Sequence, residues 1–388
     1  MPAHSPPSSP LAGSFFIGLM SGTSLDGVDG VLAAFNDDPE NKPAETLAHA
    51  HIPFTGAMRA ELMALQAPGH NELDREARVA NSLAGCYASC VRQLLSQSGA
   101  APQSVRAVGV HGQTIRHRPE LGYTRQANNP ALLAELCGID IIADFRSRDI
   151  AAGGQGAPLV PAFHHAVFGS PQECRVIANI GGIANITVLE PGAANTAGHD
   201  TGPGNVLMDL WISQQRNQAF DAGGAWAASG TVVPALLARL SGNAYFEKAP
   251  PKSTGRDLFH HEWLAAHLAA VQTSGKLRPE DIQRTLCELT AGTLASAIRR
   301  SAPDTRAVFV CGGGAFNVFL MQRIQEVLDG SGVRATVGTT EALGIEPMHV
   351  ESLAFAWLAR QFTQRRPGNL PAVTGARGAR ILGALYPA

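Results

Sequence analysis

The segment FFIGLMSGTSLDGVDGVLAAF, residues Phe15–Phe35, decides the fold. Two apolar runs flank a short turn of glycine, hydroxyl and carboxylate residues, and this pattern is typical of a β-hairpin. Glycines and backbone N–H groups at the tip of such a hairpin can hold a phosphate group. The turn has no G-x-x-x-x-G-K-[ST] motif and a strand-like run follows it, so it is not a P-loop. An ordinary hairpin turn is the alternative, because short motifs often occur by chance.

Length and composition indicate two domains in a cytosolic protein. The 388 residues exceed what one core usually supports. Lys and Arg number 30 against 32 Asp and Glu, which gives no electrostatic reason to expect nucleic acid or an anionic membrane as partner. Six scattered cysteines without a C-x-x-C pair favour reduced thiols over a disulfide framework or a zinc site. Residues 1–14 lack Lys, Arg and an apolar core, so we expect a flexible tail instead of a signal peptide, and no later segment is suited to span a membrane.

Polar side chains follow a buried strand in the first half of the chain. The elements expected before them are a strand near 46–53, helices over 56–65 and 72–98, and a strand over 105–110. His111, Gln113 and Thr114 come directly after the last strand. This order resembles one half of an actin-like ATPase, in which ligands bind at the carboxyl ends of strands. These three residues are therefore substrate candidates, and a capped strand end with a hydrogen-bonded histidine is the alternative.

A second polar segment follows a predicted helix over 129–137 and a strand over 139–144. It contains Arg146, Arg148 and Asp149 and continues into the glycine-rich residues 152–161. Glycines beside Arg and Asp suit a loop that closes over a polar ligand. A structural knot of ion pairs at a domain boundary is the alternative.

The second half of the chain repeats the hairpin. Strands are expected over 175–180 and 183–189 around the turn Gly181–Gly182. Asp200 follows in GHDTGPGN, residues 198–205, which we interpret as a turn at the mouth of a helix that begins at Val206. A carboxylate in such a turn is held close to ligand, so Asp200 is the candidate general base. Helix capping or turn formation is its alternative role.

Two further segments complete the candidate site. Gly312, Gly313 and Gly314 follow a strand over 308–311, and glycines there let a flat nucleotide base approach the backbone, with Asn317 fixing the local geometry. Glu346 provides a carboxylate in the loop before a helix predicted over 351–366.

Six motifs in order resemble the anhydro-N-acetylmuramic acid kinase family, which belongs to the superfamily of sugar kinases, actin and the heat-shock chaperone ATPases. They are MSGTSLDGVD (20–29), HGQTIRHRP (111–119), ADFRSRDIAAGGQGAPLVP (143–161), NIGGIAN (179–185), DTGPGN (200–205) and CGGGAFN (311–317). The resemblance implies a cytoplasmic enzyme of peptidoglycan recycling. It would open the ring of 1,6-anhydro-N-acetylmuramic acid with water and transfer a phosphoryl group from ATP to O6, giving N-acetylmuramic acid 6-phosphate.

The resemblance also implies roles for individual residues. Asp200 would be the catalytic base. Residues implied to bind ATP are Gly22, Thr23, Ser24, Leu25, Asp26, Gly27, Val28, Asp29, Asn179, Gly181, Gly182, Gly202, Gly204, Asn205, Gly312, Gly313, Gly314 and Asn317. Residues implied to bind the sugar are His111, Gln113, Thr114, Arg146, Arg148, Asp149 and Glu346. Mg²⁺ would bind mainly through phosphates and waters, with Asp26 or Asp29 contributing through water, so no direct protein ligand is expected.

The implied fold is α/β, with duplicated actin-like ATPase (ribonuclease H-like) domains and a nucleotide cleft between them. We expect residues 15–140 plus roughly 370–388 to form the N-terminal lobe and 141–369 the C-terminal lobe. The alternatives in function are a kinase for another amino sugar and a non-catalytic ATP-binding sugar sensor of the same fold. A protein of the actin assembly type would need additional sequence. A homodimer is compatible with the sequence.

Overall fold

The computed structural model describes residues 15–22, 24–37, 43–192, 196–250, 252–255, 258–271 and 277–388. The expected tail over 1–14 and the candidate Thr23 lie outside these ranges. The chain forms two compact units. Unit 1 comprises Met1–Phe163 and Glu351–Ala388, and unit 2 comprises His164–Val350.

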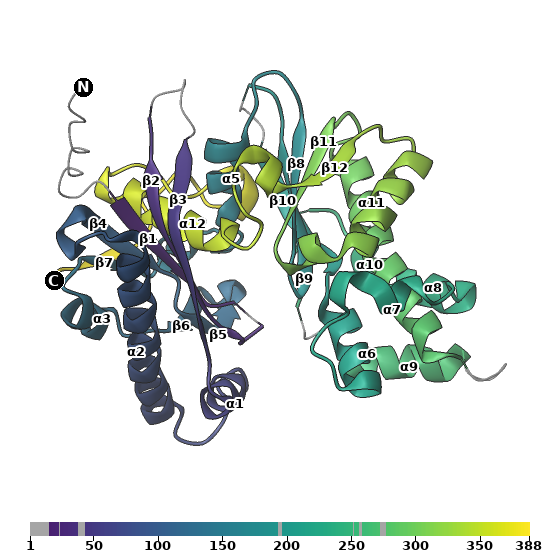
Figure 1. The fold of residues 1–388 in the computed structure, drawn as a ribbon, viewed down its shortest axis with the longest axis horizontal. Helices are drawn as coiled ribbons and strands as arrows, with labels where there is room; N and C mark the ends of the chain where they lie inside the picture. The colour runs from purple at the N-terminus through teal and green to yellow at the C-terminus, as the bar shows by residue number, and fades with distance from the viewer. Residues whose placement is uncertain are drawn as a thin grey trace, which may run out of the picture. The chain divides into compact units, whose positions relative to one another are not determined.

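Unit 1 is built on a six-stranded sheet (Figure 1). In sheet order its strands are β13 (Ala384–Tyr386), β7 (Ile141–Ala143), β4 (Val105–Val110), β1 (Phe15–Met20), β2 (Gly27–Phe35) and β3 (Ala44–Pro53). β1, β2 and β3 form an antiparallel meander, while β1, β4 and β7 run parallel. The predicted first hairpin and its third strand are therefore confirmed.

The helices of unit 1 surround this sheet. They are α1 (Gly56–Ala64), α2 (Glu72–Ser98), η1 (Pro102–Ser104), η2 (Pro119–Leu121), α3 (Pro130–Cys137), α4 (Ser147–Ala151), α12 (Val350–Thr363) and α13 (Pro371–Thr374). Helix α5 (Val160–Phe168) contains the boundary between the units. A two-stranded ribbon of β5 (Gln113–Arg118) and β6 (Tyr123–Ala127) follows β4, so Gln113 and Thr114 begin a strand.

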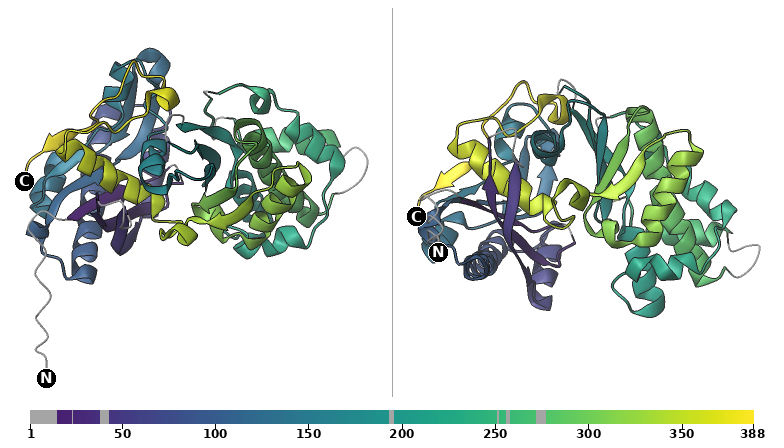
Figure 2. Two further views of the ribbon diagram at one scale, coloured as in Figure 1. Left: turned by 90° about the horizontal axis from the view of Figure 1, so that it is seen from above. Right: turned by 45° about the horizontal axis from the view of Figure 1, so that its top comes forward.

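Two glycines let α12 approach the sheet closely. Gly18 on β1 and Gly109 on β4 are register partners. A Cβ atom at Gly18 would overlap the carbonyl oxygen of Ser352, and one at Gly109 would overlap that of Phe355. The yellow α12 ribbon accordingly lies against the purple strands in both views of Figure 2. Any larger residue at these two positions would push the helix away from the sheet.

The predicted domain boundaries after residue 140 and near 369 are wrong. Strand β7 follows residue 140, yet it pairs with β4 at Val108 and Gly109 and so completes the sheet of unit 1. Helix α12 belongs to the same unit because it packs on β1 and β4. The sequence does not reveal these long-range pairings, which move the boundaries to 163/164 and 350/351.

Unit 2 repeats the strand order and directions of unit 1. Its sheet contains β10 (Thr196–Pro203), β9 (Ile183–Leu189), β8 (Arg175–Ile180), β11 (Ala307–Cys311) and β12 (Thr336–Thr339), in that order. The first three strands are antiparallel, and β8, β11 and β12 run parallel. A three-stranded meander whose first strand continues into a parallel pair is the ribonuclease H-like arrangement. Its presence in both units confirms the duplicated fold.

The helices of unit 2 form a large apolar core with this sheet. They are α6 (Val206–Arg216), η3 (Ala222–Gly224), α7 (Ala225–Ala228), α8 (Pro234–Ser241), η4 (Ala244–Glu247), α9 (His261–Val271), α10 (Pro279–Ser301), η6 (Gly313–Phe316), α11 (Val318–Gly330) and η7 (Thr340–Leu343). Much of α10 is buried within this core.

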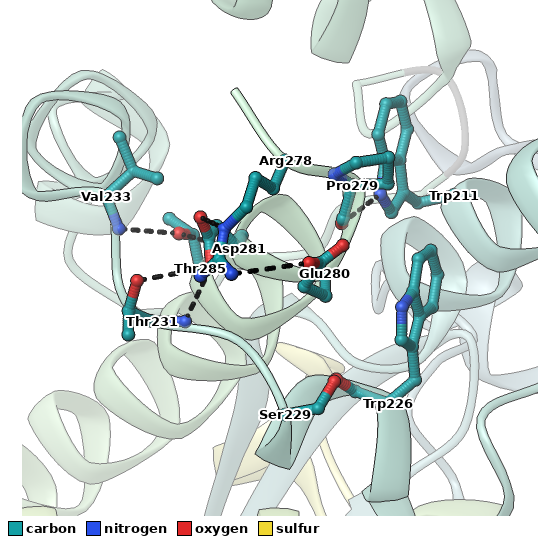
Figure 3. Close-up of polar contacts among 10 residues, drawn as sticks. All are labelled: Trp211, Trp226, Ser229, Thr231, Val233, Arg278, Pro279, Glu280, Asp281 and Thr285. Carbon is teal, nitrogen blue, oxygen red and sulfur yellow. Dashed lines mark hydrogen bonds and ion pairs between the residues drawn. The ribbon is translucent and has the colours of Figure 1, made fainter. Parts of the chain in front are cut away.

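Polar contacts fix the start of α10 against the segment before α8 (Figure 3). The Asp281 carboxylate accepts hydrogen bonds from the Thr231 N–H at 2.8 Å and from the Thr231 hydroxyl at 3.1 Å, and it pairs with Arg278 at 2.7 Å. The Thr285 hydroxyl accepts from the Val233 N–H at 2.9 Å. These bonds satisfy backbone groups that would otherwise lack partners inside the protein.

Two further properties concern the whole described chain. All six cysteines are free thiols, in agreement with their scattered positions. Within the described ranges, none of the helices combines the length and apolarity that a bilayer crossing requires.

Candidate active site

Side chains from α2 and from the start of β5 hold the turn of the first hairpin. The Ser21 hydroxyl donates to the Gly112 carbonyl oxygen at 3.1 Å and forms a hydrogen bond with the Tyr87 hydroxyl at 2.8 Å. The Gln113 side-chain amide donates to the Gly22 carbonyl oxygen at 3.1 Å. The predicted phosphate turn and the predicted substrate segment are therefore in direct contact. Tyr87 was not predicted, because a tyrosine on an apolar helix face usually indicates core packing alone.

The tip of this turn combines a buried anchor with exposed polar groups. The Leu25 side chain is fully buried, its backbone has a φ of 57°, and its carbonyl oxygen accepts from Arg59 at 2.9 Å. The Ser24 hydroxyl donates to the Asp26 carboxylate at 2.7 Å, and both residues are exposed. The turn thus presents a hydroxyl and a carboxylate to solvent from a fixed backbone.

Three of the predicted ATP-binding residues lie on β2, after the turn. Gly27 packs tightly against β3, and Val28 is fully buried. The Asp29 carboxylate contacts the ring nitrogens of His51 at 2.8 Å and His49 at 3.9 Å. Burial raises the pKa of Asp29, but hydrogen bonds with the two histidines outweigh it and hold the pKa below its usual value. Among the described side chains, Asp26 bonds only to the Ser24 hydroxyl, and it therefore has fewer side-chain partners than Asp29.

His111 and Arg146 form a buried pair beneath the same turn. The Arg146 guanidinium donates to His111 Nε2 through Nε at 3.1 Å and through Nη2 at 2.9 Å, and its Nη1 donates to the Gly156 carbonyl oxygen at 2.7 Å. Nε2 must then accept, so the ring proton is on Nδ1, which lies 3.3 Å from the Ser21 carbonyl oxygen.

The charges of this pair follow from burial. Burial and the neighbouring Arg146 lower the pKa of His111 to about 3. Burial also lowers the pKa of Arg146, to about 10, while Glu351 and Asp149 act in the opposite direction. His111 is thus neutral and Arg146 charged near pH 7, and His111 is suited to position the turn instead of exchanging protons.

Asp149 has a structural environment. Its fully buried carboxylate accepts hydrogen bonds from the Gly156 N–H at 2.8 Å, from Asn369 at 2.6 Å and from the Thr374 hydroxyl at 2.7 Å. These contacts support the structural alternative for Asp149, although the partners are neutral groups instead of ions. Arg148, one residue earlier, is exposed and is separated from this network.

The remaining sugar candidates are less closely connected. The Thr114 hydroxyl accepts from the Gln126 side chain at 3.2 Å within the β5–β6 ribbon. Glu346 belongs to unit 2, lies in the loop that connects η7 to α12 in sequence, and is half-buried. Its backbone carbonyl accepts from the His349 N–H at 3.0 Å.

In unit 2 the Gly181–Gly182 turn contacts the end of β10. The Asn205 N–H donates to the Gly181 carbonyl oxygen at 2.8 Å, and the Gly204 N–H donates to that of Gly182 at 2.9 Å. The Asn205 side chain donates to the Ile180 carbonyl oxygen at 3.2 Å. A Cβ atom at Gly204 would overlap the backbone of Gly181, so this approach requires glycine.

The glycine segment after β11 reaches the same end of β8. Gly312 has a φ of 76°, and a Cβ atom there would lie 2.5 Å from the Asn179 side-chain oxygen. A Cβ at Gly314 would overlap the Ile180 side chain, and one at Gly313 would lie 3.6 Å from the Asn205 side-chain nitrogen. Three motifs that are distant in sequence therefore meet in unit 2.

Asn317 and Gly202 have defined local roles. The Asn317 side chain caps α11 by accepting from the Leu320 N–H at 3.0 Å, as its predicted role in local geometry requires. Gly202 has a φ of 152° and packs against Phe246. The Thr290 hydroxyl donates to the Gly204 carbonyl oxygen at 2.8 Å from α10. Thr290 was missed because its distance along the chain hides this contact.

The predicted turn around Asp200 is wrong. Asp200 lies on β10 opposite Asn185 of β9, and the register shifts between Asp200 and Gly202. Helix α6 begins only after Asn205, so Asp200 does not cap it. The small and polar residues of DTGPG indicated a turn, but pairing with β9 extends them as the third strand of the second meander.

The Asp200 carboxylate lies in a largely buried setting with one backbone donor. It accepts from the Thr254 N–H at 3.0 Å. The Asp200 N–H donates to the Lys252 carbonyl oxygen at 3.3 Å, and its own carbonyl oxygen accepts from the Tyr245 hydroxyl at 2.9 Å. Burial raises the pKa of Asp200 to about 6, although the Thr254 N–H opposes the rise. A carboxylate with a pKa near 6 is ionised at neutral pH and basic enough to take a proton.

Comparison with known proteins identifies the family. The model of the family described as anhydro-N-acetylmuramic acid kinase matches residues 14–388. A relative of that name from Burkholderia pseudomallei (strain 1710b) is 55% identical over 386 residues, covering 97% of this chain and 98% of the relative. One from Burkholderia cenocepacia is 54% identical over 388 residues, covering all of both chains.

Among solved structures, the activator of the 2-hydroxyisocaproyl-CoA dehydratase from Clostridium difficile with bound ADPNP is 14% identical. It has a TM-score of 0.47 and covers 90% of this chain and 96% of its own. The family match and the relatives extend over nearly the whole sequence. The chain therefore belongs to the anhydro-N-acetylmuramic acid kinase family.

Proposed function

We propose that this kinase adds water to C1 of 1,6-anhydro-N-acetylmuramic acid and transfers the γ-phosphoryl group of ATP to O6. The products are N-acetylmuramic acid 6-phosphate and ADP. The observation that carries the proposal is the 55% identity to a curated family member over 97% of the chain. A non-catalytic sugar sensor is not favoured, because Asp200 retains a setting suited to a general base.

Asp200 acts as the base of the ring-opening step. Water attacks C1, its proton passes to the Asp200 carboxylate, and the C1–O6 bond breaks. O6 forms a bond to the γ-phosphorus as the bond from that phosphorus to the β-phosphate oxygen breaks. A pKa of about 6 matches this role, because the carboxylate is ionised before the reaction and can hold the proton afterwards.

The glycine turns of both hairpins bind the phosphates of ATP. The Ser24 hydroxyl and the Gly22 backbone belong to the first turn, and Gly181 and Gly182 form the second. The segment Gly312–Gly314 contacts the adenosine, because glycine at these positions removes the Cβ atoms that would block its approach.

Mg²⁺ fits the first turn. Among the described residues Asp26 receives a hydrogen bond from Ser24, and its exposed carboxylate can accept further bonds from the waters of a hard cation. Asp29 is engaged by two histidines and fits less well. When bound with ATP, Mg²⁺ neutralises phosphate charge.

Gln113 contacts the sugar. Its side chain is fully buried, and its amide oxygen has no hydrogen-bond partner among the described residues. A buried acceptor without a donor is costly, and a sugar hydroxyl or N-acetyl N–H can supply that donor. Arg146 donates to His111, which lies two residues before Gln113 in sequence. Its positive charge suits the lactyl carboxylate of the sugar.

The reaction belongs to peptidoglycan recycling in the cytoplasm, because its substrate is an anhydro sugar of the cell wall and its second substrate is ATP. An ADP-release assay tests the proposal with 1,6-anhydro-N-acetylmuramic acid, other anhydro sugars and plain hexosamines. We expect the first compound to give the highest kcat/KM. Equal turnover of plain hexosamines would contradict the ring-opening function, and release of ADP without phosphorylated sugar would indicate an ATPase.

A further inference from the structure

Three arginines line a surface pocket at the β13–β7 edge of unit 1, and a fourth lines a smaller pocket that shares two of them. The pocket has a volume of about 410 Å³ and is lined by Arg148, Arg365, Ala379, Arg380, Ile381 and Gly383. A second pocket of about 230 Å³ shares Arg148 and Arg380 and adds Arg377. The larger volume is within the range of sites for small molecules. We call Arg148, Arg365, Arg377 and Arg380 the arginine cluster.

The arginine cluster is separate from the phosphate turn of the same unit. In the order β13-β7-β4-β1-β2-β3, the cluster lies at the β13 end, while the turn joins β1 and β2. Arg148, which the sequence suggested as a sugar ligand, belongs to the arginine cluster and makes no hydrogen bond or ion pair with the phosphate turn among the described residues. The site inferred below therefore goes beyond the proposed kinase function.

Buried hydrogen bonds fix the walls of the pocket. Asp149 ties α4 to Asn369 and Thr374. The Arg377 N–H donates to the Ala152 carbonyl oxygen at 2.9 Å. The Arg380 N–H donates to the Asn369 side-chain oxygen at 2.7 Å. These bonds fix the main chain that carries Arg148, Arg377 and Arg380 before any ligand arrives, so binding has to order only their side chains.

The charge of the cluster is not neutralised within the described part of the chain. No carboxylate there lies within ion-pair distance of Arg148, Arg365, Arg377 or Arg380. In contrast, Arg366 pairs with Asp37 at 3.4 Å, directly after Arg365 in sequence.

Two aspartates close to Arg148 in sequence have other partners. The Asp149 carboxylate is buried and accepts three neutral donors. Asp144 accepts from the Ser147 hydroxyl at 2.6 Å. The chain as a whole carries a net charge of −2, so a general excess of basic residues does not explain the cluster.

We propose that the arginine cluster binds a phosphorylated small molecule at a site distinct from the phosphate turns. Like charges gathered in one pocket repel each other, and a multivalent anion relieves that repulsion. Guanidinium groups match phosphate oxygens through paired, charge-assisted hydrogen bonds. The main-chain contacts of the Arg377 and Arg380 side chains, at 3.2 Å and 2.9 Å, leave other guanidinium N–H groups for such bonds.

Equilibrium dialysis with labelled pyrophosphate in metal-free buffer tests this proposal on the full chain. The test variant is Arg365→Gln with Arg380→Gln. Its matched control is Arg92→Gln with Arg334→Gln, which removes the same charge from α2 and from the segment before β12. We expect the wild type and the control to bind one more equivalent of pyrophosphate than the test variant. Losing two charge-assisted contacts should raise the Kd of pyrophosphate at this site at least about tenfold.

Competition identifies the anion. Displacement of pyrophosphate by inorganic phosphate or by glucose 6-phosphate would assign the site to free phosphate or to phosphomonoesters, and resistance to both would assign it to diphosphates. Citrate that competes as well as these phosphates would overturn the assignment to phosphate. Identical isotherms for the wild type and the test variant, or no saturable binding by the wild type, would overturn the site itself. The test variant should release ADP at the wild-type rate. The dialysis experiment measures binding alone, so its result would stand even if the kinase proposal failed.

Discussion

Replacing Asp200 by asparagine should stabilise the protein at neutral pH while it removes turnover. Burial raises the pKa of Asp200 from its ordinary value of 3.8 to about 6. The folded state therefore binds the proton more tightly than the unfolded state. Ionisation of Asp200 opposes folding above pH 6, and this penalty disappears below pH 4, where both states are protonated.

The magnitude follows from the same two pKa values. The difference between 3.8 and about 6, at about 1.4 kcal/mol per pKa unit, gives roughly 3 kcal/mol. Partial exposure of Asp200 lets solvent screen the charge, so we expect a gain of about 1–3 kcal/mol for Asp200→Asn at pH 8. Asparagine is nearly isosteric and its side-chain oxygen can still accept from the Thr254 N–H.

Urea unfolding followed by circular dichroism measures this effect between pH 4 and pH 8. The variant Asp329→Asn, at an exposed position on α11 of the same unit, is the control and should change stability by less than about 0.5 kcal/mol. The stability difference between Asp200→Asn and the wild type should grow from near zero at pH 4 to its full value at pH 8. A variant that is no more stable than the wild type at pH 8, or a difference independent of pH, would refute the reasoning.

Three other perturbations test the geometry. Gly18→Ala should lower the free energy of unfolding in urea by about 3 kcal/mol or more, because the added methyl group meets the α12 backbone. Its control is Gly56→Ala, where a Cβ meets open space and stability should stay within about 1 kcal/mol of the wild type. Equal effects of the two substitutions would contradict the packing of α12. Asp149→Asn should cost about 1–3 kcal/mol by the same assay, since the new amide NH2 would face at least one of the three hydrogen-bond donors that now donate to the two carboxylate oxygens. An unchanged midpoint would rule out the structural role of Asp149. Thr254→Pro removes the N–H that stabilises ionised Asp200, whereas Thr254→Ala retains that N–H. The acid limb of the kcat/KM profile should therefore lie at higher pH in the proline variant than in the alanine variant. Coincident pH profiles would argue against this contact.

The hairpins and most helices could be predicted because their signals are local. The apolar runs on either side of Ser21–Asp26 specify two strands, and the helix predicted over 72–98 ends at Gly99, whose φ of 68° is left-handed. The recurrence of the hairpin at Gly181–Gly182 indicated that the second half repeats the first, and the family resemblance implied the duplicated units.

The remaining features depend on tertiary contacts that local sequence does not encode. Strand β10 contains Asp200 because β9 pairs with it, although its composition indicates a turn. Tyr87 and Thr290 reach the glycine turns from helices that lie 66 and 86 residues away in sequence. The candidate general base was chosen from its motif, but its raised pKa comes from burial and could only be obtained from the fold.

Turnover in water enriched with ¹⁸O tests the central claim most directly. If Asp200 activates water for attack on C1, mass spectrometry should find one ¹⁸O atom at C1 of N-acetylmuramic acid 6-phosphate for each ADP released. Asp200→Asn should retain ATP binding and lose both products together, by at least about 100-fold. Phosphorylated sugar without the label, or an Asp200→Asn variant that forms labelled product at the wild-type rate, would contradict the account.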